Sequence, residues 1–247
     1  MPSLQISIPT RDGRCPAHLL TPAVEGRWPA VIFYADAGGI RPALVEMAQR
    51  LADAGHVVLL PDLFYRYGPY GPLVPRKVFQ GDVMAILGPL MATTGNDKVA
   101  QDTESFLACL DQCGAVEGRQ VGAVGFCMGG GMAITAAGTF PDRFVAAASF
   151  HGGSLATEAP TSPHRIAPRI EAEVYVAHAD NDALCPPPMV ERLSQAFDDA
   201  GVRCVAETYA GAAHGWMVTD FPTFDAVASE RGWRAMLALF DRTLRNA

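Results

Sequence analysis

The chain has 247 residues, of which 49% are hydrophobic and 18% are charged, and its formal net charge at pH 7 is −7. That length and hydrophobic content predict one sizeable core within a single α/β domain, residues 1–247, rather than two small domains. The acidic balance argues against a nucleic-acid partner, because binding to phosphates requires clusters of basic residues.

No segment of the sequence resembles an export signal or a membrane span. Residues 1–14 lack the apolar stretch of a signal peptide. The longest apolar run, Val83 to Ala92, contains Gly88 and Pro89 and is too short to cross a bilayer. The six cysteines show no C-x-x-C spacing, which disfavours a zinc site or a thioredoxin motif. We therefore expect a cytoplasmic protein with reduced thiols, a monomer or small homo-oligomer with no membrane partner, and no metal or other cofactor.

Short apolar runs rich in β-branched residues alternate with amphipathic helical patterns along the chain. This alternation predicts a mostly parallel central sheet with helices on both faces. The turn tripeptide Arg11-Asp12-Gly13 separates the first two runs and predicts an N-terminal antiparallel hairpin. In chain order, the predicted elements are strands at 4–8, 16–21 and 30–34, a helix at 41–54, a strand at 56–60, a helix at 97–114, a strand at 121–126, a helix at 130–139, strands at 146–150 and 173–178, a helix at 189–200, a strand at 203–209 and a helix at 224–244.

Residues 64–96 fit neither the helical nor the strand period. The segment is rich in proline and glycine and carries Tyr65, Tyr67 and Tyr70. A long irregular stretch in a compact domain commonly covers or lines a binding site. We therefore expect a lid or a substrate-lining segment here.

The sequence GFCMGGG, which begins at Gly125, lies where a predicted strand meets a predicted helix. A residue placed between glycines at such a junction occupies a sharp, strained turn that lifts its side chain above the sheet edge. The turn also places the N–H of Met128 at the positive end of the next helix, where it can stabilise an oxyanion. Cys127 is therefore the predicted nucleophile, since a thiolate reacts readily near neutral pH. A phosphate-binding loop is disfavoured, because the segment contains neither G-K-[ST] nor G-x-G-x-x-G.

Such a nucleophile predicts that an acid and then a histidine follow in chain order, each in a loop after a later strand. Asp180 and Asp182 follow one predicted strand, and His214 follows the last one. The residues alone do not choose between the two aspartates. His151 closes another predicted strand at the same edge and is a candidate pocket residue.

On these motifs, the chain resembles the dienelactone hydrolase family of the α/β-hydrolase superfamily, whose most specific mark is G-x-C-x-G-G at the nucleophile. The resemblance extends from about Ala30 to the last helix and is weakest over 64–96. It implies the α/β-hydrolase fold, a Cys-His-Asp triad and an acyl-thioenzyme intermediate. It favours Asp182 as the acid, because the family's acid lies four residues before a proline, here Pro186. Asp180 would then cap a loop.

The resemblance also assigns roles to the loop after the strand at 30–34. Ala37 would supply the second oxyanion N–H. Asp36 stands where well-known members have a glutamate that touches the nucleophile, but its side chain is one methylene shorter. Two interpretations of Asp36 remain open, namely a place in the substrate site beside Cys127 or the capping of its own loop.

We expect the substrate to differ from that of the dienelactone enzymes. Those enzymes bind their substrate's carboxylate through arginines, one of them a helical turn after the catalytic histidine, where this chain has Val218. Arg66, Arg76 and Lys77 are more typical of surface charges than of a replacement. We expect Trp216 to line an apolar substrate site, which indicates an uncharged or aromatic ester or lactone.

The leading hypothesis is therefore a cofactor-free hydrolase of small carboxylic esters or lactones. A thioesterase or acyltransferase would use the same triad. A non-enzymatic ligand-binding member of the fold would typically have lost a triad residue, whereas this chain retains all three. A metalloenzyme is disfavoured, because the chain has no H-E-x-x-H motif.

Overall fold

The central sheet is the framework that places the predicted site residues. The computed structural model describes residues 4–245, so residues 1–3 and 246–247, at the ends of the predicted domain, lie outside it. Within this part of the chain, eight strands form one sheet in the order β1-β2-β4-β3-β5-β6-β7-β8. The strands are β1 Leu4–Thr10, β2 Gly13–Leu20, β3 Trp28–Tyr34, β4 Val57–Pro61, β5 Val116–Phe126, β6 Phe144–Phe150, β7 Glu173–Asn181 and β8 Cys204–Ala213.

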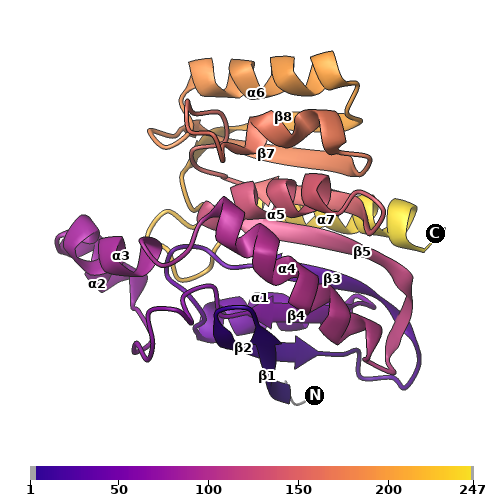
Figure 1. Cartoon of the computed structure of the whole chain (residues 1–247). Coiled ribbons are helices and arrows are strands. Elements are labelled where there is room, and N and C mark those ends of the chain that lie inside the picture. Colours follow the sequence, from indigo (N-terminus) through magenta and orange to yellow (C-terminus); the bar gives the residue numbers. More distant parts are fainter. Residues whose placement is uncertain (1–3, 246–247) are drawn as a thin grey trace.

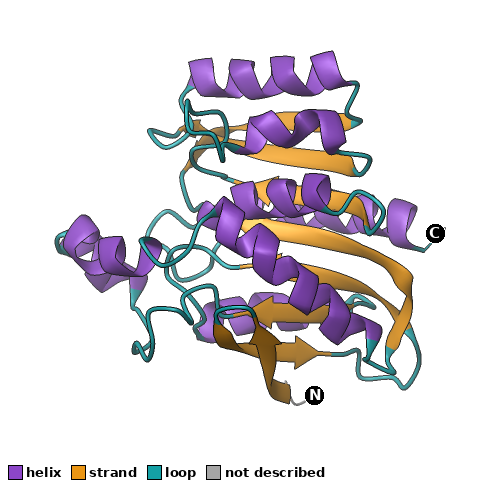
Figure 2. Ribbon diagram, in the orientation of Figure 1, coloured by secondary structure: helices purple, strands orange, loops and turns teal. Residues whose placement is uncertain are grey.

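Strand direction and helix placement match the predicted architecture. β1 and β2 form an antiparallel hairpin, β2 pairs antiparallel with β4, and the remaining neighbours are parallel. One face of the sheet is covered by α1 and α7, and the other by α4, α5, α6 and the short 3₁₀ helix η1 (Figures 1 and 2). The mostly parallel sheet with an N-terminal hairpin is therefore confirmed. These helices are α1 Pro42–Asp53, α4 Asn96–Asp111, α5 Met128–Thr139, η1 Pro163–Arg169, α6 Pro187–Ala200 and α7 Ala226–Leu244.

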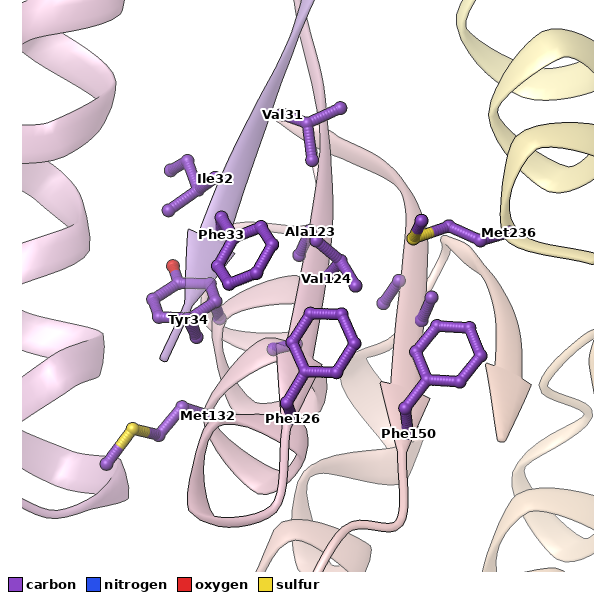
Figure 3. Close-up of a cluster of buried hydrophobic side chains, with 14 of the residues drawn as sticks. Val31, Ile32, Phe33, Tyr34, Ala123, Val124, Phe126, Met132, Phe150 and Met236 are labelled. Carbon is purple, nitrogen blue, oxygen red and sulfur yellow. The ribbon is translucent and has the colours of Figure 1, made fainter. Parts of the chain in front are cut away.

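The inner strands are hydrophobic on both sides, as expected where helices cover both faces of a parallel sheet. Phe33, Phe126 and Phe150 are fully buried and stack in a row, with ring centroids 4.9 Å apart for the first pair and 5.5 Å apart for the second (Figure 3). Burial of each such side chain contributes about 1.5–3 kcal/mol. Because Phe126 precedes Cys127, this packing holds the strand that leads into the predicted nucleophile turn.

The segment 64–96, predicted to be irregular, contains two short helices, α2 (Pro75–Gln80) and α3 (Val83–Met91). Proline in the first turn begins α2, and the side chain of Asp82 caps the N-terminus of α3. The prediction missed both helices because each is too short to establish a period among the surrounding prolines and glycines. The pair projects from the body of the protein at one end of the sheet (Figure 1). No helix within residues 4–245 combines the length and the apolar content that a membrane span requires.

The junction between β5 and α5 is a strained turn. Cys127 has a φ of 54°, a value that residues with side chains rarely adopt, and such strain costs on the order of 1–3 kcal/mol. Backbone hydrogen bonds hold the turn, since the Cys127 N–H donates to the Phe150 carbonyl at 3.1 Å and the Gly130 N–H donates to the Cys127 carbonyl at 3.0 Å. A Cβ on Gly125 would lie 1.8 Å from the Gly129 carbonyl oxygen. Glycine is therefore required here for close backbone contact between strand and helix.

We expect Gly125→Ala to destabilise the protein, because the added Cβ would meet a backbone carbonyl that cannot move without opening this junction. The free energy of unfolding, measured by urea denaturation, should fall by about 1–3 kcal/mol, as for an overpacked core position. Gly114→Ala is the matched control, since a Cβ at Gly114 meets nothing within 4 Å; it should change stability by no more than about 0.5 kcal/mol. Equal stability of the two variants would contradict this account of the turn.

Candidate active site

The last two strands bring Asp182 and His214 together. β7 and β8 are paired as far as Asn181 and Ala213, so the next residue of each chain segment lies at the same edge of the sheet. There His214 Nδ1 donates to Asp182 Oδ2 at 2.7 Å, and the other carboxylate oxygen accepts the Leu184 N–H at 2.8 Å. Both strands run further than the sequence predicted, and this extension closes the distance between the two side chains.

Asp180 serves a different contact. β7 is irregular between Ala179 and Asn181, and Asp180 Oδ2 accepts the N–H of Gly211 in β8 at 3.0 Å. Its side chain is exposed, whereas that of Asp182 is 1% exposed. Asp180 on β7 therefore binds a backbone N–H of β8, and only Asp182 contacts the ring of His214.

Cys127 and His214 line the same cavity and interact with each other. Burial of the imidazole lowers the pKa of His214, but the hydrogen bond to Asp182 and the interaction with Cys127 outweigh it and raise the pKa to about 10. The contact with Cys127 lacks hydrogen-bond geometry, so Nε2 has no hydrogen-bond partner within residues 4–245. Such contacts commonly tighten only when substrate binds. A histidine this basic can take the thiol proton and hold a thiolate as an ion pair.

Two backbone N–H groups border the nucleophile turn. Met128 opens α5, so its N–H has no acceptor within the helix. Ala37, in the loop after β3, lines the same cavity as Cys127. The loop approaches α5 closely because a glycine occupies the helix start, where a Cβ on Gly129 would lie 2.2 Å from the Tyr34 carbonyl oxygen. N–H groups in such positions can stabilise negative charge on a carbonyl oxygen.

The cavity in front of Cys127 and His214 is apolar and has a volume of about 190 Å³. Its walls come from α2, α3, the loop after β3, and the loops after β7 and β8. Apart from the cysteine and the histidine, its lining side chains are apolar, among them Leu73, Val78, Phe79, Val83, Leu87, Leu184 and Phe221. The segment 64–96 thus contributes to the cavity through apolar residues, Phe79 among them, rather than through its tyrosines. Tyr70, for example, donates to Asp62.

Trp216 does not line the cavity, which corrects the prediction. Its side chain is fully buried and stacks on Tyr209 with centroids 4.3 Å apart. Gly215, with a φ of 90°, turns the chain after His214 and directs Trp216 into the core. His151 is also fully buried, with its ring edge-on to that of His214 at 5.3 Å. Burial, and secondarily the charge of His214, keeps the pKa of His151 well below its usual value. The rings of Trp216 and His151 therefore pack against each other in the core and do not line the cavity.

Asp36 and Val218 are likewise buried away from the cavity. Asp36 therefore does not have its predicted place in the substrate site, and the position of Val218 does not face that site. Asp36 Oδ1 accepts the Gly38 N–H at 2.7 Å, and Arg41 donates to both carboxylate oxygens, at 2.8 and 2.9 Å. Asp36 therefore caps its own loop, and none of these contacts involves Cys127. The short Asp36 side chain contacts Arg41 and does not reach Cys127.

No lysine or arginine lines the cavity among residues 4–245. Arg66 binds Asp102 and Asp12, and Arg76 and Lys77 are exposed on α2. In the same part of the chain, no group of three or more His, Cys, Asp or Glu residues is placed to hold a metal ion.

Two cavity residues that the sequence analysis missed, Leu184 and Phe221, lie in loops. Loops carry no hydrophobic period, so no pattern identified them. Val83 and Leu87, by contrast, are spaced by one helical turn on α3, and this i, i+4 spacing could have indicated an apolar face.

We expect Asp182→Asn to remove pH-dependent stability that His214 provides. The pKa of His214 is raised from 6.5 to about 10, so its protonation stabilises the fold fully below pH 6.5, and this contribution is lost as the pH rises through 10. Without the Asp182 carboxylate, burial should lower that pKa. The difference in unfolding free energy from the wild type should therefore be larger near pH 6 than near pH 10.5, by on the order of 1 kcal/mol or more.

Urea denaturation at both pH values measures this difference, with Asp180→Asn as the matched control. The control should retain the wild-type dependence on pH. If both aspartate variants show the same pH profile, the interaction assigned to Asp182 and His214 is wrong.

Known proteins resemble this chain in sequence over most of its length. The family model described as the dienelactone hydrolase family matches residues 15–244. A protein of Methylorubrum extorquens, provisionally named carboxymethylenebutenolidase, is 24% identical over 235 residues, which cover 94% of this chain and 78% of the relative. A protein of Escherichia coli K12 with the same provisional name is 26% identical, over 95% of this chain and 84% of the relative.

Solved structures share the fold of this chain. The structure of a provisionally named dienelactone hydrolase from Klebsiella pneumoniae has a TM-score of 0.85 at 23% identity and covers 97% of this chain and 98% of that one. P91, a dienelactone hydrolase-like promiscuous phosphotriesterase from metagenomic libraries, has a TM-score of 0.75 at 24% identity, covering 98% and 99% of the two chains. The α/β-hydrolase fold implied by the sequence is therefore confirmed, and the chain belongs to the dienelactone hydrolase family.

Proposed function

We propose that this protein hydrolyses uncharged carboxylic esters or lactones through a covalent acyl-thioenzyme, with Cys127 as nucleophile, His214 as general base and acid, and Asp182 as the residue that orients the histidine. The observation that carries the proposal is the strained turn that presents Cys127 to His214 within one apolar cavity. Membership of a family of lactone and ester hydrolases supports the reaction class.

In the acylation step, His214 takes the proton of Cys127, and the sulfur attacks the carbonyl carbon of the substrate. The negative charge that develops on the carbonyl oxygen is stabilised by the N–H groups of Ala37 and Met128. The C–O bond to the leaving group then breaks as His214 protonates the departing oxygen. The product is a thioester on Cys127 and a free alcohol, or the opened hydroxyl of a lactone.

In the deacylation step, water enters as the second substrate. His214 takes a proton from the water, whose oxygen attacks the thioester carbonyl, and the same two N–H groups stabilise the second oxyanion. Collapse of this intermediate releases the carboxylic acid and returns the proton to the cysteine. Asp182 keeps Nδ1 of the ring protonated throughout, so Nε2 remains the atom that exchanges protons.

The cavity supports an uncharged substrate. Its walls are apolar, and no lysine or arginine lies among its described lining residues. A substrate carboxylate bound there would lose its hydration without gaining an arginine or lysine partner, which is unfavourable in a low-dielectric site. An aliphatic or aromatic acyl group would instead gain from burial against α2 and α3.

Cys127→Ala should abolish hydrolysis of 4-nitrophenyl acetate, because no other thiol within residues 4–245 lines the cavity with a histidine base. Cys185 lies 3.9 Å from His178 near the start of α6, but it is buried, and burial raises the pKa of its thiol to about 12. Iodoacetamide should inactivate the wild type and attach to Cys127, as determined by peptide mass spectrometry. Cys113→Ala is the control, since this half-buried thiol lies in the turn after α4 and does not line the cavity. Full activity in Cys127→Ala would exclude the proposed mechanism.

The wild type should prefer a neutral aryl ester over an analogue with a carboxylate on its acyl group. A missing charge-assisted contact corresponds to roughly 1.5–3 kcal/mol, so kcat/KM should differ by about tenfold to a hundredfold. Leu73→Arg, at a cavity-lining position, should narrow this ratio. Val74→Arg, at the next and 48% exposed position, should leave it unchanged. A wild-type preference for the acidic ester would show that the assignment of substrate class is wrong.

A further inference from the structure

A buried charge network lies beside the cavity and takes no part in the mechanism above. Arg41 donates to Asp36 through Nη1 at 2.8 Å and Nη2 at 2.9 Å, and to Asp220 through Nε at 2.7 Å and Nη2 at 2.9 Å. The side chains of Arg41 and Asp36 are 1% and 0% exposed, whereas that of Asp220 is 32% exposed. One guanidinium thus binds two carboxylates, a geometry that the planar fork of arginine permits and the ammonium of lysine does not.

The network holds the loop that carries Ala37. Besides Arg41, Asp36 Oδ1 binds the Gly38 N–H at 2.7 Å, and Arg41 Nη1 also donates to the Gly39 carbonyl at 3.1 Å. The loop is therefore fixed on both sides of Ala37 by atoms of one arginine and one aspartate. Arg41 itself lies at the start of α1, which is packed on the sheet.

The same network reaches the loop that follows His214. Asp220 belongs to this loop, and the adjacent Phe221 ring lies 5.4 Å from the Arg41 guanidinium carbon and lines the cavity. Phe221 packs so tightly on the loop that a Cβ on Gly215 would lie 2.1 Å from its ring. The packing of Phe221 therefore makes Asp220 a fixed anchor for Arg41, whereas the His214 ring itself is held by Asp182.

We propose that Arg41 is a positioning residue, which joins the oxyanion loop to the histidine loop through Asp36 and Asp220 and keeps the Ala37 N–H aligned with Cys127 during acylation. This inference rests on the proposed function, because it requires an oxyanion at Ala37. Loss of the network displaces the N–H but leaves the thiol and its base in place. It therefore slows reactions that pass through an oxyanion and spares those that need only a thiolate.

Two variants and two reactions of Cys127 test this role. Asp220→Asn removes one carboxylate charge with little change of shape, and Arg41→Lys keeps the positive charge but loses the fork. Acylation by 4-nitrophenyl acetate, followed by stopped flow, passes through an oxyanion; alkylation by iodoacetamide, a displacement at a saturated carbon, does not. In both variants we expect the acylation rate constant to fall about tenfold or more, with little change in KM. Alkylation at the same pH should remain at the wild-type rate.

Arg50→Lys is the matched control. Arg50 also belongs to α1, binds Glu230 in a bidentate manner at 2.7 and 2.8 Å, and stacks on Trp233, but it lies on the surface and does not line the cavity. This variant should leave both reactions unchanged. Thermal unfolding followed by circular dichroism establishes that each variant is folded at the assay temperature.

The outcomes separate this inference from the function on which it rests. Unchanged acylation in folded Asp220→Asn, or equal losses of acylation and alkylation, would overturn the positioning role. Asp220→Asn keeps the test decisive if Arg41→Lys fails to fold, because its carboxylate is partly exposed. Hydrolysis that survives Cys127→Ala would overturn the proposed function instead.

Discussion

The rest of the site depends on the strained backbone of Cys127. A positive φ at a residue with a side chain persists only where surrounding structure holds it. Here β6 and α5 supply the hydrogen bonds, and Gly125 and Gly129 permit the close contacts that a Cβ would forbid. The result is a thiol that projects from the sheet edge with a helix N-terminus beside it. The histidine base and the backbone N–H groups of the site are then arranged around this thiol.

Charge is divided between two environments around that point. His214 and Asp182 form a hydrogen-bonded pair that borders an apolar cavity, where low polarity strengthens the interaction of a polar group with an oxyanion. Asp36, Arg41 and Asp220 form a second group beneath the loops, out of the cavity. This separation lets the cavity remain apolar although ionised side chains lie close by. It also supports the proposal that the substrate is uncharged.

The sequence alone supplied the features that are local or that follow chain order. The alternation of strands and helices predicted the sheet, because burial on both faces imposes continuous apolar runs. The glycines around Cys127 predicted a sharp turn, and the order of nucleophile, acid and histidine predicted loops at one sheet edge. Between Asp180 and Asp182 the residues alone left the choice open, since both follow the same strand. The pairing of β7 with β8 decided between them, because the two strands remain paired up to Asn181 and Asp182 therefore lies beside His214.

The tertiary structure alone decided what surrounds the reactive groups. Trp216 and Phe221 are both aromatic residues in the loop after His214, yet the first is buried in the core and the second lines the cavity. That difference follows from the turn at Gly215 and from packing against α2 and α7, which no local pattern records. Likewise, the carboxylate of Asp220 lies 179 residues along the chain from the arginine that binds it. The sequence determines strand periods, turns and the order of the motifs, because these depend on residues that are close along the chain. Contacts between distant loops form only when the folded sheet brings those loops to one edge.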